Sequence, residues 1–111
     1  MAMFIGQSTF AQNSIEGSWN TGKHNTVVET YLKDGAYFGK VKSSEKPKAK
    51  IGIDILRDLQ LIEGKWKGKL YIPKRDRLVD AVVEPSNNEL NISISSGVMK
   101  RTLVWTRKVE E

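Results

Sequence analysis

Short runs of alternating apolar and polar residues, separated by turn-forming residues, fill most of the chain after residue 15. Residues 65–72 alternate lysine and tyrosine with tryptophan, glycine, leucine and isoleucine. Residues 90–95 alternate leucine and isoleucine with asparagine and serine. A period of two places successive side chains on opposite faces of a strand, so each run predicts a β-strand that is buried on one face.

The strongest turn signal is Asp34-Gly35, which separates the β-branched and aromatic runs at residues 26–33 and 36–42. A type I′ turn needs positive φ angles at both central residues, and Asp-Gly is a favoured pair for that conformation. These residues therefore predict a tight β-hairpin.

Further segments extend the strand pattern. Residues 15–20 predict a first strand, residues 78–84 predict a strand that ends at a turn over residues 85–88, and residues 101–109 predict the last strand. The polar segment 43–50 contains a proline and three lysines, which is typical of a surface loop.

Residues 51–62 are ambiguous, because their apolar residues also fit one face of a helix. The alternation of Ile51, Ile53 and Ile55 favours a strand. We therefore expect a strand through Ile55 that bends near residues 57–58.

These segments give about eight strands and no convincing helix, at the spacing typical of a β-sandwich or β-barrel. The chain has 111 residues, the size of a single domain, because either half alone would be too small to bury a stable core. Its formal net charge of +5, with 28% charged and 39% hydrophobic residues, is ordinary for a globular protein. We expect an all-β domain without a transmembrane segment.

Residues 1–12 carry no charge, begin with an apolar run and end with small residues at Thr9 and Ala11. Small residues at such positions are typical of the cleavage site of a signal peptide. We interpret residues 1–12 as a signal-peptide remnant, which predicts a periplasmic or secreted protein whose β-domain spans residues 13–111 and whose mature chain begins near residue 12 or 13. A disordered N-terminus or a cloning remnant is the alternative, because no Lys or Arg precedes the apolar run.

The residue inventory restricts the chemistry. The sequence contains no Cys and a single His, His24, which excludes disulfides, thiolate metal sites and cysteine nucleophiles and leaves too few ligands for a multi-histidine site. His24 lies in a turn-like segment, where a solvated side chain is the simpler interpretation. We therefore expect no catalytic residue, no metal and no cofactor, and not an enzyme; a hydrolytic enzyme built on strand carboxylates is the third alternative.

The two ends of the strand pattern carry residues that fit together. Gly17 and Trp19 lie in the first expected strand and Arg107 lies in the last. First and last strands are neighbours in a closed barrel, and a guanidinium over an indole is a favourable cation–π contact of about 0.5–2 kcal/mol. The arrangement resembles lipocalins, in which a Gly-x-Trp lies beneath an Arg from the last strand. This resemblance implies a single small antiparallel up-and-down barrel closed by Gly17, Trp19 and Arg107.

A broader resemblance covers nearly the whole β-domain. Residues 37–40 (Tyr-Phe-Gly-Lys), 66–71 (Trp-Lys-Gly-Lys-Leu-Tyr) and 102–107 (Thr-x-x-Trp-Thr-Arg) follow the Gly-x-Trp in order. In this order they resemble the bacterial family called domain of unknown function number 2147, a family of small exported lipocalin-like barrels. Residues 72–77 depart from the family's turn, and its glycine-rich approach to the last strand is reduced to Gly97. The resemblance implies a fold and export, and it supplies no reaction.

The apolar faces of the strands are expected to form the barrel interior. A small barrel can be filled by side chains or can hold one small ligand, and large aromatic side chains compete with a ligand for that space. The leading function is that of a non-enzymatic barrel that binds a small apolar or amphipathic molecule, and a filled interior is the alternative. The candidate ligand-binding residues are Trp19, Tyr37, Trp66, Leu70, Ile92 and Trp105.

A basic face supports a second function. Lys65, Lys67 and Lys69 project from one side of an expected strand. Such a face attracts anionic polymers or lipid headgroups, so an envelope interaction protein is the alternative function. Alternating lysines also keep strands soluble and discourage edge pairing. Trp66 points to the opposite face, which argues against nucleic acid as the partner.

Overall fold

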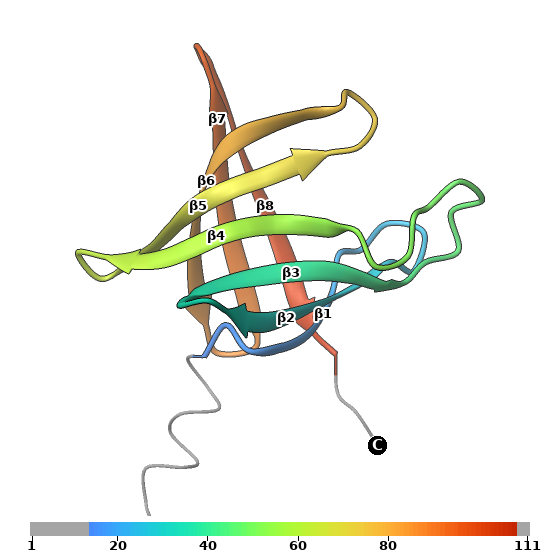
Figure 1. The fold of residues 1–111 in the computed structure, drawn as a ribbon, viewed down its shortest axis with the longest axis horizontal. Helices are drawn as coiled ribbons and strands as arrows, with labels where there is room; N and C mark the ends of the chain where they lie inside the picture. The colour runs from blue at the N-terminus through green and yellow to red at the C-terminus, as the bar shows by residue number, and fades with distance from the viewer. Residues whose placement is uncertain (1–13, 109–111) are drawn as a thin grey trace, which may run out of the picture.

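The computed structural model describes residues 14–108, which form one closed antiparallel β-barrel (Figure 1). Each strand pairs with the next along the chain, and β1 pairs with β8 to close the barrel. The predicted all-β, up-and-down barrel of eight strands is confirmed. The predicted signal-peptide remnant, residues 1–12, lies outside the described residues. The strands are β1 (Gly17–Asn20), β2 (Val27–Lys33), β3 (Ala36–Ser43), β4 (Asp54–Ile62), β5 (Lys65–Ile72), β6 (Arg77–Ser86), β7 (Glu89–Ser96) and β8 (Met99–Arg107).

The strands run alternately between two ends of the barrel, which we call the base and the mouth. In Figure 1, β3 and β4 lie across the view while β7 and β8 run up it, as expected when a twisted sheet coils to close on itself. The base carries the start of β1, the end of β8 and the turns at residues 34–35, 63–64 and 87–88. The mouth carries the loops at residues 21–26, 44–53, 73–76 and 97–98.

The predicted Asp34-Gly35 hairpin is confirmed. Asp34 and Gly35 have φ angles of 52° and 84°, positive at both central residues as the turn type requires. Glu63 and Gly64 repeat this conformation between β4 and β5, with φ angles of 53° and 85°. The base is therefore built from tight turns that hold neighbouring strands in a fixed register.

Several predicted strand boundaries need correction. β4 begins at Asp54, because residues 51–52 form a turn. In this turn the Gly52 N–H donates to the Val41 carbonyl at 2.7 Å. Ile51 is therefore exposed in the mouth loop rather than alternating within a strand. β6 continues through Pro85, which pairs with Leu90, so the following turn is confined to residues 87–88.

The other boundaries shift by a few residues. β1 begins at Gly17 rather than at residue 15, and β8 spans residues 99–107 rather than 101–109. The tight turn at residues 97–98 allows pairing between β7 and β8 to begin at Met99. The predicted strand faces are unaffected, because these shifts change the strand ends alone.

The predicted bend in β4 is confirmed and has a partner on β5. The β4–β5 register shifts between Arg57 and Gln60, and Asp58 has a φ angle of 54°. Gly68 of β5 lies against this irregularity, where a Cβ atom would stand 2.5 Å from the Arg57 carbonyl oxygen. A residue without a side chain is therefore needed at position 68 for β4 to bend over β5.

The interior toward the base is packed with side chains. Trp19, Leu56, Leu59, Leu90 and Ile92 have no exposed surface. Each large apolar side chain buried in this way contributes about 1.5–3 kcal/mol relative to an exposed position. This packed half positions the strands that surround the open half at the mouth.

Candidate functional site

The mouth half of the barrel contains a cavity of about 750 Å³, which we call the mouth cavity. Its walls come from β2, β3, β4, β5 and β8, which contribute inward-facing apolar side chains because of the period-two alternation along each strand. The apolar walls include Val28, Val41, Ile55, Leu70, Leu103 and Trp105 of these strands and Ile53 of the loop before β4.

The cavity is open because β1 is short. β1 pairs with β8 through two residue pairs, Trp19 with Arg107 and Asn20 with Thr106, whereas β7 pairs with β8 through eight. Past Asn20 the chain leaves the sheet for the loop at residues 21–26, and the cavity extends along β8 over residues 102–105. Within the described chain, the upper part of β8 thus has a strand neighbour on one side only.

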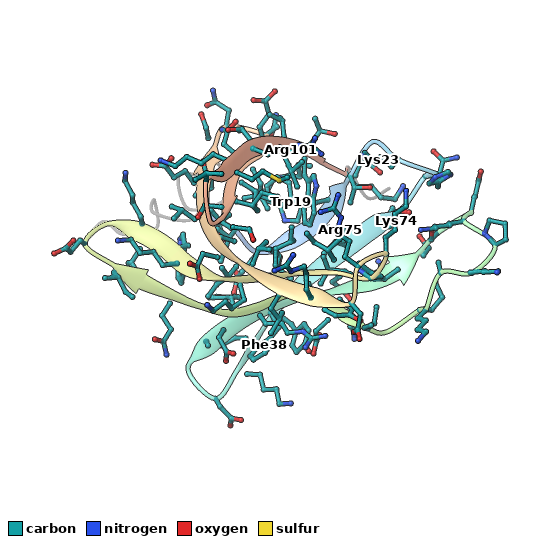
Figure 2. All side chains as sticks on the ribbon, turned by 90° about the horizontal axis from the view of Figure 1, so that it is seen from above. Trp19, Lys23, Phe38, Lys74, Arg75 and Arg101 are labelled. Atoms are coloured by element: carbon teal, nitrogen blue, oxygen red, sulfur yellow. The ribbon has the colours of Figure 1, made fainter. Side chains whose placement is uncertain are left out.

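The opening of the cavity is lined by positive charge. Lysines from three mouth loops contribute to its lining, together with His24, and no Asp or Glu lines it among the described residues. Figure 2 shows Lys23 and Lys74 at the same side of the molecule, and the strand directions place both at the mouth. We call the set of exposed lysines the lysine rim, and it consists of Lys23, Lys46, Lys48, Lys50 and Lys74.

Two acidic residues near the mouth are held by tyrosines instead of lining the cavity. The Tyr31 hydroxyl donates to Asp54 at 2.6 Å, and this bond to a carboxylate raises the pKa of Tyr31 to about 12. The Tyr71 hydroxyl donates to Asp76 at 2.6 Å and has its pKa raised for the same reason. These carboxylates therefore leave the lysine rim without a counterion in the cavity.

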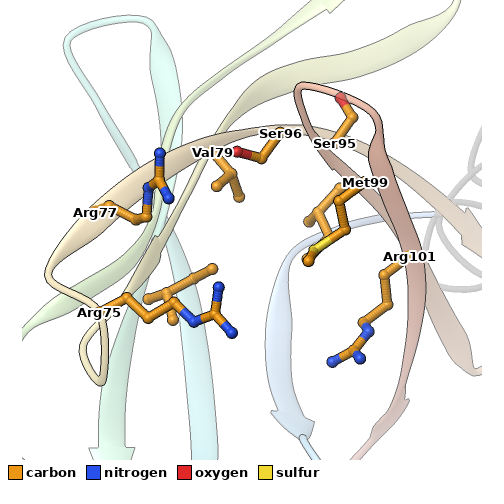
Figure 3. Close-up of a pocket in the computed structure, with 9 residues that line it drawn as sticks. Arg75, Arg77, Val79, Ser95, Ser96, Met99 and Arg101 are labelled. Carbon is orange, nitrogen blue, oxygen red and sulfur yellow. The ribbon is translucent and has the colours of Figure 1, made fainter.

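A second, smaller pocket of about 160 Å³ lies beside the mouth cavity, and we call it the arginine pocket. Arg75, Arg77 and Arg101 line it (Figure 3). Arg77 pairs with Ile72 and Arg101 pairs with Ile94, so these arginines share the inner face with the apolar side chains of their partners.

The arginine pocket was absent from the sequence-based candidates. The period-two alternation could have predicted that Arg77 and Arg101 face inward. Arg77 is two residues from buried Val79, and Arg101 is two residues from inward-facing Leu103. An arginine in phase with a buried face points into a barrel.

The structure divides the six candidate ligand-binding residues into three pairs. Leu70 and Trp105 line the mouth cavity, whereas Trp19 and Ile92 belong to the packed core with no exposed surface. Tyr37 and Trp66 form a T-shaped contact with ring centroids 5.3 Å apart and do not line the cavity.

Tyr37 points its hydroxyl away from the cavity toward the base. The hydroxyl donates to the Glu16 carboxylate at 2.5 Å, which raises the pKa of Tyr37 to about 12. The interior is therefore both filled and open, packed toward the base and hollow at the mouth. The size of an aromatic side chain does not predict whether it lies in the packed half or lines the open half of the interior.

The predicted closure of the barrel is present at the base. Arg107 lies over Trp19, with 4.3 Å from its guanidinium carbon to the ring centroid, and Trp19 Nε1 donates to the Ile15 carbonyl at 3.1 Å. Gly17 has a φ angle of 131°, and a Cβ atom there would stand 2.7 Å from Nη1 of Arg107. All three predicted closure residues thus meet in one contact.

The predicted basic face lies on the outside of β5 but is partly neutralised. Lys69 Nζ lies 2.5 Å from Asp80, and Lys65 Nζ lies 3.9 Å from Glu84. Both carboxylates belong to β6, the neighbouring strand. Lys67 lies between them, exposed on the same strand. The mouth cavity, in contrast, has five lysines and no carboxylate of the described residues in its lining.

Within residues 14–108, no cluster of three or more His, Cys, Asp or Glu residues could hold a metal ion. No helix long and apolar enough to cross a membrane occurs in this part of the chain. Comparisons with protein-family models, with curated proteins and with solved structures give no match. The resemblance to domain of unknown function number 2147 stays a prediction from the sequence.

Proposed function

We propose that this protein is a non-enzymatic binding protein that holds a small amphipathic molecule in the mouth cavity. The observation that carries the proposal is an apolar cavity of about 750 Å³ whose opening is lined by five lysines and no carboxylate of the described residues. Cavities of about 300–1,000 Å³ with apolar walls and a few polar groups are typical of small-molecule sites.

The two parts of the cavity suit the two parts of such a ligand. Its hydrocarbon part gains about 0.8 kcal/mol for each methylene group that leaves water for the walls formed by residues such as Leu70 and Leu103. Its polar end stays at the lysine rim, where an anionic group meets positive charge from Lys23, Lys48 and Lys74. A neutral or cationic head would gain nothing from the rim.

A dye-displacement experiment tests this function. Anilinonaphthalene sulfonate should become fluorescent in the wild-type cavity and be displaced by dodecanoate. Leu103→Trp adds an indole inside the cavity and should weaken dye binding by about tenfold or more. Leu61→Trp is the matched control, because Leu61 is 60% exposed, lies at the base end of β4 and does not line the mouth cavity. Circular dichroism establishes that both variants fold.

Two results would overturn the proposal. One is the absence of dye uptake by folded wild-type protein. The other is equal uptake by Leu103→Trp and Leu61→Trp, which would place the dye outside the cavity.

The lysine face of β5 is the less favoured binding surface. Lys65 and Lys69 already face carboxylates of β6, so an anionic polymer or lipid headgroup would have to compete with Glu84 and Asp80. Binding of an anionic envelope component that is lost in Lys67→Gln, without dye uptake, would favour this alternative.

We also propose that the protein acts in the periplasm or after secretion. The support is the uncharged, apolar composition of residues 1–12 and the small residues at Thr9 and Ala11. In that setting an amphipathic ligand would come from the envelope or the surrounding medium.

A further inference from the structure

Three arginines from two parts of the barrel surround the arginine pocket. Arg75 comes from the turn between β5 and β6, Arg77 from the start of β6 and Arg101 from β8. Figure 3 shows Arg75 and Arg101 extending toward one another across the pocket. None of the three guanidinium groups forms a hydrogen bond or ion pair with another residue in the described chain.

The carboxylate nearest to the three arginines in sequence forms a hydrogen bond with another residue. Asp76, between Arg75 and Arg77, accepts the Tyr71 hydroxyl at 2.6 Å. Tyr71 in turn stacks with Arg57, whose guanidinium carbon lies 4.6 Å from the ring centroid. Asp76 therefore belongs to a cluster around Tyr71, and the arginine pocket keeps three positive charges that repel one another until an anion enters.

The apolar lining of the pocket strengthens its attraction for an anion. Ile72, Val79 and Ile94 line the pocket with the arginines and displace water from part of its wall. Charge-assisted hydrogen bonds are stronger where water is partly excluded. Ser96 faces the same side as Met99, its partner across the hairpin, and adds a hydroxyl donor to the pocket wall.

We infer that Arg75, Arg77 and Arg101 form a binding site for a phosphate monoester group. A phosphate monoester carries about 1.5–2 negative charges at pH 7, compared with one on a carboxylate, and so balances more of the charge of the three arginines. Its oxygens accept the paired N–H donors of guanidinium groups in bidentate geometry. The pocket volume of about 160 Å³ far exceeds that of one water molecule and admits such a group.

The phosphate can come from two sources. Arg75 follows Lys74, and Arg101 precedes Thr102, and both of these neighbours line the mouth cavity. A phosphate in the arginine pocket can thus be the headgroup of an amphipathic molecule whose chain lies in the cavity, a case that rests on the proposed function. It can equally belong to a small phosphate ester without a chain, which is independent of the proposed function.

Calorimetric titrations of the full chain with dodecyl phosphate, dodecanoate and inorganic phosphate test the inference. The test variant is Arg75→Gln/Arg101→Gln. The matched control is Lys67→Gln/Lys100→Gln, which removes the same charge from exposed residues, one of them adjacent to Arg101 on the other face of β8. Circular dichroism checks that both variants fold.

Wild type should bind dodecyl phosphate about tenfold or more tightly than dodecanoate, and the arginine variant should lose this preference while the control keeps it. Inorganic phosphate that binds with the same dependence on the arginines identifies a free phosphate site. Arginine dependence seen with dodecyl phosphate alone identifies a headgroup site.

The inference is overturned if wild type and the arginine variant bind dodecyl phosphate and inorganic phosphate equally, or if neither compound binds. If the phosphate site is overturned in this way but dodecanoate displaces the dye, the proposed binding function of the mouth cavity still holds. Conversely, inorganic phosphate binding that depends on the arginines, in a protein that takes up no dye, supports the arginine pocket and refutes the cavity ligand.

Discussion

Replacing Arg107 by alanine should destabilise the barrel by about 1–3 kcal/mol, because this side chain connects β8 to the start of the chain. The guanidinium carbon lies 4.3 Å from the Trp19 ring centroid. Nη1 donates to the Glu16 carbonyl at 2.8 Å, and Nη2 donates to the Ser14 carbonyl at 2.9 Å. All of these contacts are lost in Arg107→Ala.

The magnitude follows from adding the contacts and subtracting one cost. The cation–π contact and packing of the side-chain stem on Trp19 contribute about 1–2 kcal/mol. The two hydrogen bonds add about 0.5–1.5 kcal/mol each, with the exposed one to Glu16 at the low end. Against this, the Nε of Arg107 is buried without an acceptor, a cost of about 1 kcal/mol that truncation removes.

Urea unfolding followed by circular dichroism measures the effect in wild type, Arg107→Ala, Trp19→Leu and the double mutant. The coupling energy between the two sites should be about 0.5–2 kcal/mol, because the hydrogen bonds to Ser14 and Glu16 are lost equally in either background. Arg107→Lys should recover part of the loss, since lysine keeps the charge without the planar, forked guanidinium.

Two results would refute this reasoning. A coupling energy indistinguishable from zero would mean that Arg107 stabilises the barrel without its contact to Trp19. Full recovery of stability by Arg107→Lys would mean that charge alone, rather than stacking and paired hydrogen bonds, matters at the base.

Three further predictions concern other parts of the molecule. Gly68→Ala should cost about 2–4 kcal/mol or prevent folding in a urea titration, because the new Cβ would stand 2.5 Å from a backbone oxygen of β4, and stability equal to wild type would contradict this. Tyr31 and Tyr37 should ionise near pH 12 in an ultraviolet titration rather than near 10, and since their folded pKa values are raised, the stability they contribute should be present below pH 10 and lost between pH 10 and 12. N-terminal sequencing of the protein from its native source should find a mature chain that begins near Gln12 or Asn13, and retention of Met1 would remove the export proposal.

The strand pattern and its closure could be predicted because they depend on local chemistry. Period-two alternation marks the faces of a strand whatever surrounds it, and Asp34-Gly35 adopts its turn from its own φ preferences. Trp19 and Arg107 are far apart in sequence, but an antiparallel barrel must bring its first and last strands together, and they pair directly.

The division of the interior could not be predicted in this way. Alternation shows that Ile92 and Leu70 both face inward, yet one is in the packed core and the other also lines the mouth cavity. The difference depends on how far β1 extends beside β8, which depends on where the chain leaves the sheet after Asn20. Neither the composition nor the alternation of the sequence predicts how far β1 extends beside β8.

The junction between β1 and β8, which has two residue pairs, also determines which part of the barrel breaks first under tension. The beginning of β1 and the end of β8 lie together at the base, where the Lys108 N–H donates to the Ser18 carbonyl at 2.8 Å. Tension applied between residues 14 and 108 would load this antiparallel pair from one end, so its bonds break in sequence instead of sharing the load. The barrel would therefore unzip along this seam first, so the first event under force is the exposure of the packed core around Trp19 at the base, with the remaining ladders still joined.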